Sequence, residues 1–205
     1  MKKILIMAVI CLFTSISADD SVDIWRTYHD NGKVKCEIPC VDGKIHGIGK
    51  CYFESGQLKY EMQYVHDKFH GIWKEYYKNG QIKEEASHVD GKEHGIWKCY
   101  YENGQIKEEA SYVDGERHGI WKWYYESGEL MTEVPWNHGE IHGIAKECYK
   151  NGELHYERQY VHSERHGIWK WYYKNGELKE ESLYVDGELK GTNNYDENGQ
   201  IIKSN

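Results

Sequence analysis

Six His-Gly dipeptides spaced 24 residues apart are the first residues in the sequence whose type and spacing could do chemistry. If each 24-residue repeat is a β-hairpin stacked on the next, equivalent residues lie ~9.6 Å apart. This is too far for two histidines to share one zinc ion with bonds of ~2.1 Å. Three copies have a second histidine four residues earlier, which could come close across a turn, but no Cys or carboxylate completes a familiar ligand set. We therefore expect no metal and no cofactor, and interpret the histidines as turn residues beside a glycine of positive φ. The copies are His46, His70, His94, His118, His142 and His166, and the earlier partners are His66, His138 and His162.

The cysteines favour a single disulfide over a disulfide framework. By the alternation of strand residues, Cys36, Cys40 and Cys51 share one face. Cys36 and Cys40 are ~13 Å apart along one strand and cannot bond each other, but either could reach Cys51 on the next strand. We name Cys40–Cys51 as the candidate disulfide. The spacing of Cys99 and Cys148 supports no Cys–His nucleophile, and we expect no catalytic residue.

Tryptophan is the candidate binding residue. The chain has 18 Tyr and 8 Trp but only 3 Phe, a composition that suits half-buried surfaces because Tyr and Trp carry a polar group on an apolar body. These rings either pack together as the apolar layer of the sheet or form an exposed platform for a protein, peptide or glycan. The candidate surface comprises Trp73, Trp97, Trp121, Trp123, Trp169 and Trp171.

The elements that position these residues repeat every 24 residues, the step from each His-Gly to the next. In the unit Ile72–Gly95, the β-branched and aromatic segment Ile72–Tyr77 is typical of a strand. Asn79-Gly80 predicts a two-residue type I′ hairpin turn, and Asp90–Gly95 forms the turn into the next unit. The chain is therefore expected to be all-β, an elongated antiparallel meander, solenoid-like, with a single sheet of about seven 24-residue hairpins.

Charge predicts the register of each hairpin. A two-residue loop at Asn79-Gly80 places Tyr77 opposite Ile82, Lys74 opposite Glu85 and Trp73 opposite Ala86. The position of Lys74 is basic in every unit and that of Glu85 is acidic in every unit. Cross-strand pairs of opposite charge stabilise a sheet by roughly 0.2–1 kcal/mol each, and a slip of one residue would break them all.

Two places in the array depart from the repeat. Gly49 and Ala145 replace the usual tryptophan, and each follows a strand that contains a proline, Pro39 or Pro135. Proline removes a ladder hydrogen bond from an interior strand and usually marks a bulge. We therefore predict a local kink or groove at both places.

The N-terminus is typical of a secretory signal. Lys2 and Lys3 precede the ten apolar residues Ile4–Phe13, and the small residues of Thr14–Ala18 provide a cleavage region. Ten apolar residues are too few to span a bilayer, which needs ~20. We expect residues 1–18 to be a signal peptide and residues 19–205 to be the repeat array, exported to the periplasm, the cell envelope or the medium and not transmembrane after cleavage.

The pattern Gly-x-Trp-x-x-Tyr-Tyr-x-Asn-Gly-x-Leu/Ile-x-x-Glu, as in Gly95–Glu109 and Gly167–Glu181, resembles the MORN repeat variant of bacterial proteins similar to the YwqK antitoxin family. The resemblance covers Ile24 to about Ile201. It implies β-hairpin arrays that act in protein or membrane contacts, and some members neutralise a partner toxin. The export signal of this chain departs from an antitoxin that acts in the cytosol.

A net charge of −8 with no basic block argues against nucleic acid as the partner. We expect an exported, non-catalytic scaffold that binds a protein. The alternatives are an immunity protein that neutralises a toxin, and an envelope or glycan binder that uses the tryptophan rows.

Overall fold

Strands and turns account for the whole described chain. The computed structural model describes residues 22–204, which form one 19-stranded sheet. The predicted signal peptide lies outside these residues. The strands are β1 (Val22–Tyr28), β2 (Val34–Val41), β3 (Lys44–Ile45), β4 (Gly47–Tyr52), β5 (Leu58–Val65), β6 (Lys68–Tyr76), β7 (Ile82–Val89), β8 (Lys92–Tyr100), β9 (Ile106–Val113), β10 (Glu116–Tyr124), β11 (Leu130–Asn137), β12 (Glu140–Ile141), β13 (Gly143–Cys148), β14 (Leu154–Val161), β15 (Glu164–Arg165), β16 (Gly167–Tyr172), β17 (Leu178–Val185), β18 (Glu188–Tyr195) and β19 (Ile201–Ser204).

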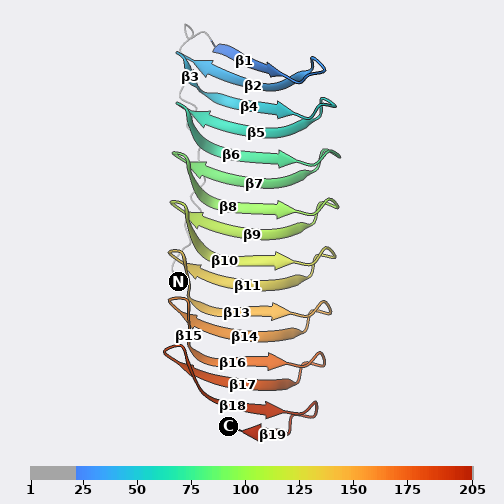
Figure 1. Cartoon of the computed structure of the whole chain (residues 1–205), viewed down its shortest axis with the longest axis vertical. Helices are drawn as coiled ribbons and strands as arrows, with labels where there is room; N and C mark the ends of the chain where they lie inside the picture. Colours follow the sequence, from blue (N-terminus) through green and yellow to red (C-terminus); the bar gives the residue numbers. More distant parts are fainter. Residues whose placement is uncertain (1–21, 205) are drawn as a thin grey trace, which may run out of the picture.

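The strands follow one another along the sheet in chain order and every pair is antiparallel, as in β1–β2, β5–β6 and β18–β19. The sheet stays open, with β1 at one end and β19 at the other (Figure 1). The two-residue strands β3, β12 and β15 each precede a longer strand that pairs with the same neighbour. The predicted meander of hairpins is confirmed.

In the unit Ile72–Gly95, the tight two-residue turn lies at Asp-Gly and not at Asn-Gly, where the sequence predicts it. Val89 pairs with Lys92 around Asp90 (φ 51°) and Gly91 (φ 86°), so Asp-Gly forms the two-residue turn with two positive φ angles. At Asn-Gly only Gly80 has positive φ, and the Tyr77 N–H donates to the Gln81 carbonyl at 2.8 Å around a three-residue loop. The type I′ prediction for Asn79-Gly80 is therefore wrong.

Asn79 serves the stacking of units instead. Its side-chain oxygen accepts from the Gln81 N–H at 3.0 Å within the loop. Its amide donates to the carbonyl of Glu102 in the next unit at 3.3 Å. The side-chain amides of Asn103 and Asn151 donate the same hydrogen bond to the next unit, so asparagine links the loops along this edge of the array.

The charged register is confirmed despite the longer loop. Lys74 faces Glu85 and Trp73 faces Ala86, but Ile82 faces Tyr76 and not Tyr77. The third loop residue shifts the pairing by one position, and a bulge between the pairs of Tyr76 and Glu75 shifts it back. The longer loop and the bulge therefore offset each other, and the pairing of Lys74 with Glu85 is the one predicted.

A second bulge bends each unit where the sequence suggests a turn. His94 and Gly95 lie inside β8, and Gly95 has φ 93° where the register between β7 and β8 shifts. This irregularity recurs in units without proline, since β15 and β16 are interrupted at His166 opposite Gln159. The irregularities predicted beside Pro39 and Pro135 are therefore present, but every unit has one at this position, so their attribution to proline is wrong.

The core is a row in which large and small residues alternate across neighbouring strands. Trp121 and Trp169 are each 5 % exposed, and Ala110, which faces Trp97, is fully buried. Where glycine replaces tryptophan its neighbours are larger: Gly49 faces Met62, and a Cβ on Gly49 would lie 2.9 Å from Ile38. Ala145 faces Arg158 and is 6 % exposed. Neighbouring side chains thus fill the predicted grooves.

Candidate binding surfaces

The six tryptophans predicted as a binding platform belong largely to the core. Trp121 lies 5.7 Å from Trp136 and 5.8 Å from Trp123, measured between ring centroids. Trp169 lies 4.8 Å from Tyr184. The remaining predicted residues, Trp73, Trp97, Trp123 and Trp171, are half-buried.

Cations and hydrogen bonds complete this aromatic layer. The guanidinium of Arg117 lies 4.3 Å from the Trp121 ring centroid and that of Arg165 lies 5.1 Å from the Trp169 centroid. The indole N–H of Trp97 donates to Glu84 at 2.7 Å, and that of Trp169 donates to the Gln159 carbonyl at 2.8 Å. Trp169 therefore has protein partners at both its face and its polar edge, which supports the packing interpretation for this ring.

The opposite face carries an apolar row that the sequence reasoning did not single out. One isoleucine of every unit, two residues before the repeated cation, is 47–55 % exposed. The residues opposite these isoleucines are mixed: Ser87 faces Ile72 and Gln159 faces Ile144, whereas Leu183 faces Ile168. We call this set the isoleucine row: Ile24, Ile48, Ile72, Ile96, Ile120, Ile144 and Ile168.

The polar groups beside the isoleucine row bind one another. Lys146 lies 3.7 Å from Glu133 and 3.9 Å from Glu157, on the strands to either side. The hydroxyl of Tyr76 donates to Glu61 at 2.8 Å and that of Tyr100 donates to Glu85 at 2.6 Å. Glu61 and Glu157 each accept from a tyrosine hydroxyl and lie 3.7 and 3.9 Å from a lysine, so these members of the charged ladder have partners within the chain.

The pKa values along this ladder follow from burial and from the shared glutamates. Burial, and then the hydrogen bond to Glu61, raise the pKa of Tyr76 to about 12. At the exposed end of the ladder, the hydrogen bond from Arg26 lowers the pKa of Glu37. Tyr76 therefore remains a neutral donor, and Glu37 a charged acceptor, at neutral pH.

The disulfide joins Cys36 to Cys51, so the predicted Cys40–Cys51 bond is wrong. Cys36 and Cys51 are direct partners across β2 and β4, whereas Cys40 pairs with Ile45 beyond the interruption at His46. In the register of β2 and β4, Cys40 lies four residues along β2 from Cys36, the direct partner of Cys51. The Cys40 side chain is 2 % exposed and free.

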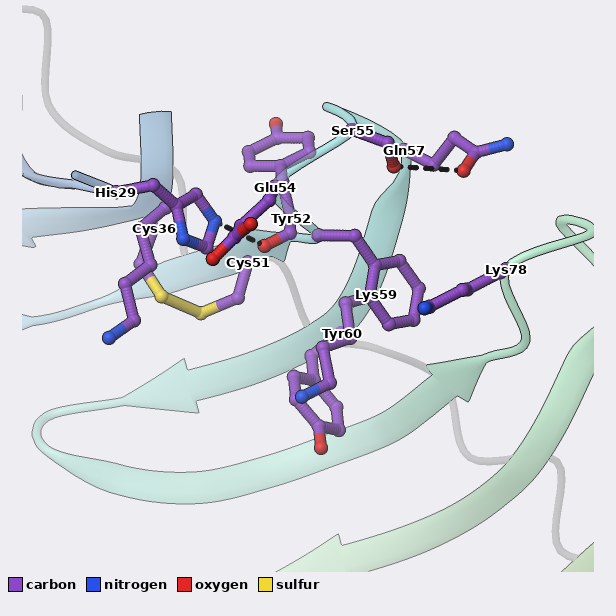
Figure 2. A pocket seen from close by; sticks show the side chains of 12 residues that line it. His29, Cys36, Cys51, Tyr52, Glu54, Ser55, Gln57, Lys59, Tyr60 and Lys78 are labelled. Carbon is purple, nitrogen blue, oxygen red and sulfur yellow. Dashed lines mark hydrogen bonds between the residues drawn. A yellow bond between two sulfur atoms is a disulfide. The ribbon is translucent and has the colours of Figure 1, made fainter. Parts of the chain in front are cut away.

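A hollow of about 510 Å³ lies beside this disulfide. Figure 2 shows His29 and the disulfide on one side of it, with Tyr60, Lys59 and Lys78 on the other. Phe53 also lines the hollow and stands where later units have a tyrosine. The hydroxyls of those tyrosines donate to a carbonyl of the next unit at 2.7–3.0 Å; they belong to Tyr77, Tyr101, Tyr125, Tyr149 and Tyr173.

This hydroxyl ladder gives a matched pair of predictions. Replacing Tyr101 by phenylalanine should lower the free energy of unfolding by ~0.5–1.5 kcal/mol, because the Tyr124 carbonyl loses its donor. Replacing Phe53 by tyrosine should raise that free energy by a similar amount, because the new hydroxyl reaches the corresponding carbonyl of Tyr76. Urea titrations measure both changes, and equal signs for the two variants would contradict the role assigned to the ladder.

Histidine pairs do form, but between units. Within residues 22–204, the ring centroids of His46 and His66 lie 5.2 Å apart, those of His118 and His138 5.6 Å, and those of His142 and His162 5.4 Å. The same residues contain no group of three or more His, Cys, Asp or Glu side chains arranged to hold a metal ion. They also contain no helix long and apolar enough to cross a membrane.

The repeat matches a known family model along most of the chain. No curated protein matches the chain. The model described as the MORN repeat variant matches seven segments: residues 24–39, 45–66, 69–90, 93–114, 117–138, 141–162 and 165–186. The boundaries of these segments repeat with the hairpin units described above. The chain therefore belongs to the MORN repeat variant family.

Proposed function

We propose that this chain is an exported, non-catalytic scaffold that binds a protein partner through the isoleucine row. The observation that carries the proposal is the exposure of the same aliphatic residue in every unit, 47–55 % at each position. Exposed apolar side chains that recur on one face between polar groups form a surface of the kind that marks interaction sites. The charged ladder, whose members bind one another, supplies these polar groups.

The dimensions favour a protein over a small ligand. Successive isoleucines are two strands apart, ~9.6 Å, so the seven residues extend over ~58 Å. An extended, open row suits another protein surface, whereas small molecules bind in concave pockets. The polar groups recur in every unit, which differs from the single cluster of convergent groups expected of an active site.

Export is the second part of the proposal. It is supported by the lysines, apolar segment and small-residue region of residues 2–18. We expect the intact mass of the protein recovered from the cell envelope fraction or the medium to correspond to a chain that begins at Asp19. Recovery of the chain from the cytosol with its N-terminus intact would contradict export.

The partner's identity separates this scaffold role from the immunity role that the resemblance to the YwqK family suggests. The experiment is affinity capture from an envelope fraction of the organism's own cells, followed by mass spectrometry. A stoichiometric protein supports a scaffold, and a toxin among the captured proteins supports the immunity role. Retention of saccharide or lipid without protein would instead favour the glycan or envelope alternative.

A further inference from the structure

The N-terminal edge of the sheet, which shares only Ile24 with the isoleucine row, is a second exposed surface. All seven residues of β1 are exposed, and among the described residues β1 pairs only with β2. A strand at such an edge leaves alternate backbone N–H and C=O groups available to another strand. Figure 1 places β1 at one end of the array, and no other strand of residues 22–204 lies beyond it.

The array itself shows what covers this kind of surface. In the interior, the first strand of each unit pairs with the second strand of the unit before it. Trp97 of β8 faces Ala86 of β7, and Lys98 faces Glu85. Trp121 and Trp169, at the position of Trp25, are 5 % exposed, whereas Trp25 is 53 % exposed. Trp25 thus keeps the inner half of its packing site and lacks the outer half.

The repeated cation shows the same difference between the edge strand and the interior strands. Lys146 lies between two glutamates, at 3.7 and 3.9 Å, one on each neighbouring strand. Arg26 occupies the equivalent position of β1 and bonds to Glu37 at 2.9 Å on its inner side. Its outer side faces the open edge. An incoming strand with a carboxylate at that position would give Arg26 the second partner that Lys146 has.

We propose that β1 binds an extended segment of a partner protein as an added antiparallel strand. The segment carries Asp or Glu opposite Arg26 and a small residue, Ala or Ser, opposite Trp25. The interior second strand β7, whose sequence is IKEEASHV, is the template for this chemistry. The main chain supplies hydrogen bonds, and the two side-chain positions supply specificity.

A second copy of the chain fits this edge less well. The opposite edge, β19, spans only Ile201–Ser204. Ser204 pairs with Asn193, so serine occupies the register position that glutamate holds in the interior hairpins. A carboxylate opposite Arg26 is therefore missing from the copy's own edge.

The probe is a fluorescein-labelled peptide with the sequence IKEEASHV. Protein purified from its own cells is added to the peptide, and fluorescence anisotropy measures binding. A second peptide, IKEKASHV, replaces the glutamate that should face Arg26 by lysine. We expect the first peptide to bind at least about tenfold more tightly, because the second places two cations opposite each other. The Arg26→Glu variant should reverse this preference, whereas Lys98→Glu, at the same position of an interior unit, should retain it.

Hydrogen exchange locates the binding site without any substitution. We expect the first peptide to slow exchange of the β1 amides that point away from β2, and to leave the β8 amides unchanged. Equal affinity for the two peptides, or no added protection in β1, would overturn the proposal. Sedimentation that reveals a dimer from which the peptide is excluded would also overturn it, since the edge would then belong to a second copy. These outcomes do not depend on the isoleucine row.

Discussion

Replacing Trp121 by alanine should lower the free energy of unfolding by ~3–5 kcal/mol, the cost of removing a large aromatic side chain from a packed core. Trp121 is 5 % exposed and contacts Trp123, Trp136 and the Arg117 guanidinium. Since each unit packs only on its neighbours, the loss should concentrate in the central hairpins. Urea titration followed by circular dichroism, with hydrogen exchange to locate the weakened strands, measures the effect.

Trp25 is the matched control for this substitution, because it occupies the same position in the first unit and is 53 % exposed. We expect Trp25→Ala to cost about 1 kcal/mol or less, as is usual for substitutions away from a packed core. Equal losses at Trp25 and Trp121 would contradict the assignment of the tryptophan face as the core.

Removing the disulfide should have the second largest effect. The bond between Cys36 and Cys51 closes a loop with a sequence separation of 15. Loops of this length predict a loss of ~3 kcal/mol when Cys36 and Cys51 are both replaced by serine. The bond holds β2 to β4 near the end of the array, where stacked repeats fray first. The loss should therefore appear as faster hydrogen exchange in β1, β2 and β4, with β13–β17 unchanged.

Cys99→Ser is the control for the chemical change, since Cys99 is a half-buried free thiol outside the loop. We expect it to have a much smaller effect on stability. A peptide map made under non-reducing conditions should link the peptides of Cys36 and Cys51 and leave Cys40 alkylated after denaturation. A map that links Cys40 to Cys51 would contradict the register of β2 and β4.

The sequence predicts the fold well because its strongest signals are periodic. The cation at Lys74 and the carboxylate at Glu85 recur in every unit and specify one register. The detail of the loop is not predictable from this signal. A third loop residue and a bulge cancel each other, so the pairing of Lys74 with Glu85 is the same with or without them.

The candidate surfaces are less predictable, because both faces of the sheet carry apolar side chains. Alternation separates Trp73 from Ile72 but does not say which face is covered. Burial of one face depends on packing between units. On the tryptophan face, tryptophan alternates with alanine across strands, and Arg117 lies over the Trp121 ring. The exposed face has its own signal in the sequence, an isoleucine two residues before every repeated cation. Similarly, the choice of Cys36 over Cys40 depends on the register between units, in which Glu37 faces Lys50 and Cys36 therefore faces Cys51.

The role of the isoleucine row is tested most directly by measuring the affinity of the captured protein partner for two double variants. Ile72→Lys with Ile96→Lys places charge in the row. Val89→Lys with Val113→Lys makes the same chemical change at residues that are 38 % and 37 % exposed outside it. We predict that the isoleucine variant binds at least about tenfold more weakly than the unmodified chain, while the valine variant binds normally. Unchanged binding by a folded isoleucine variant would contradict the account.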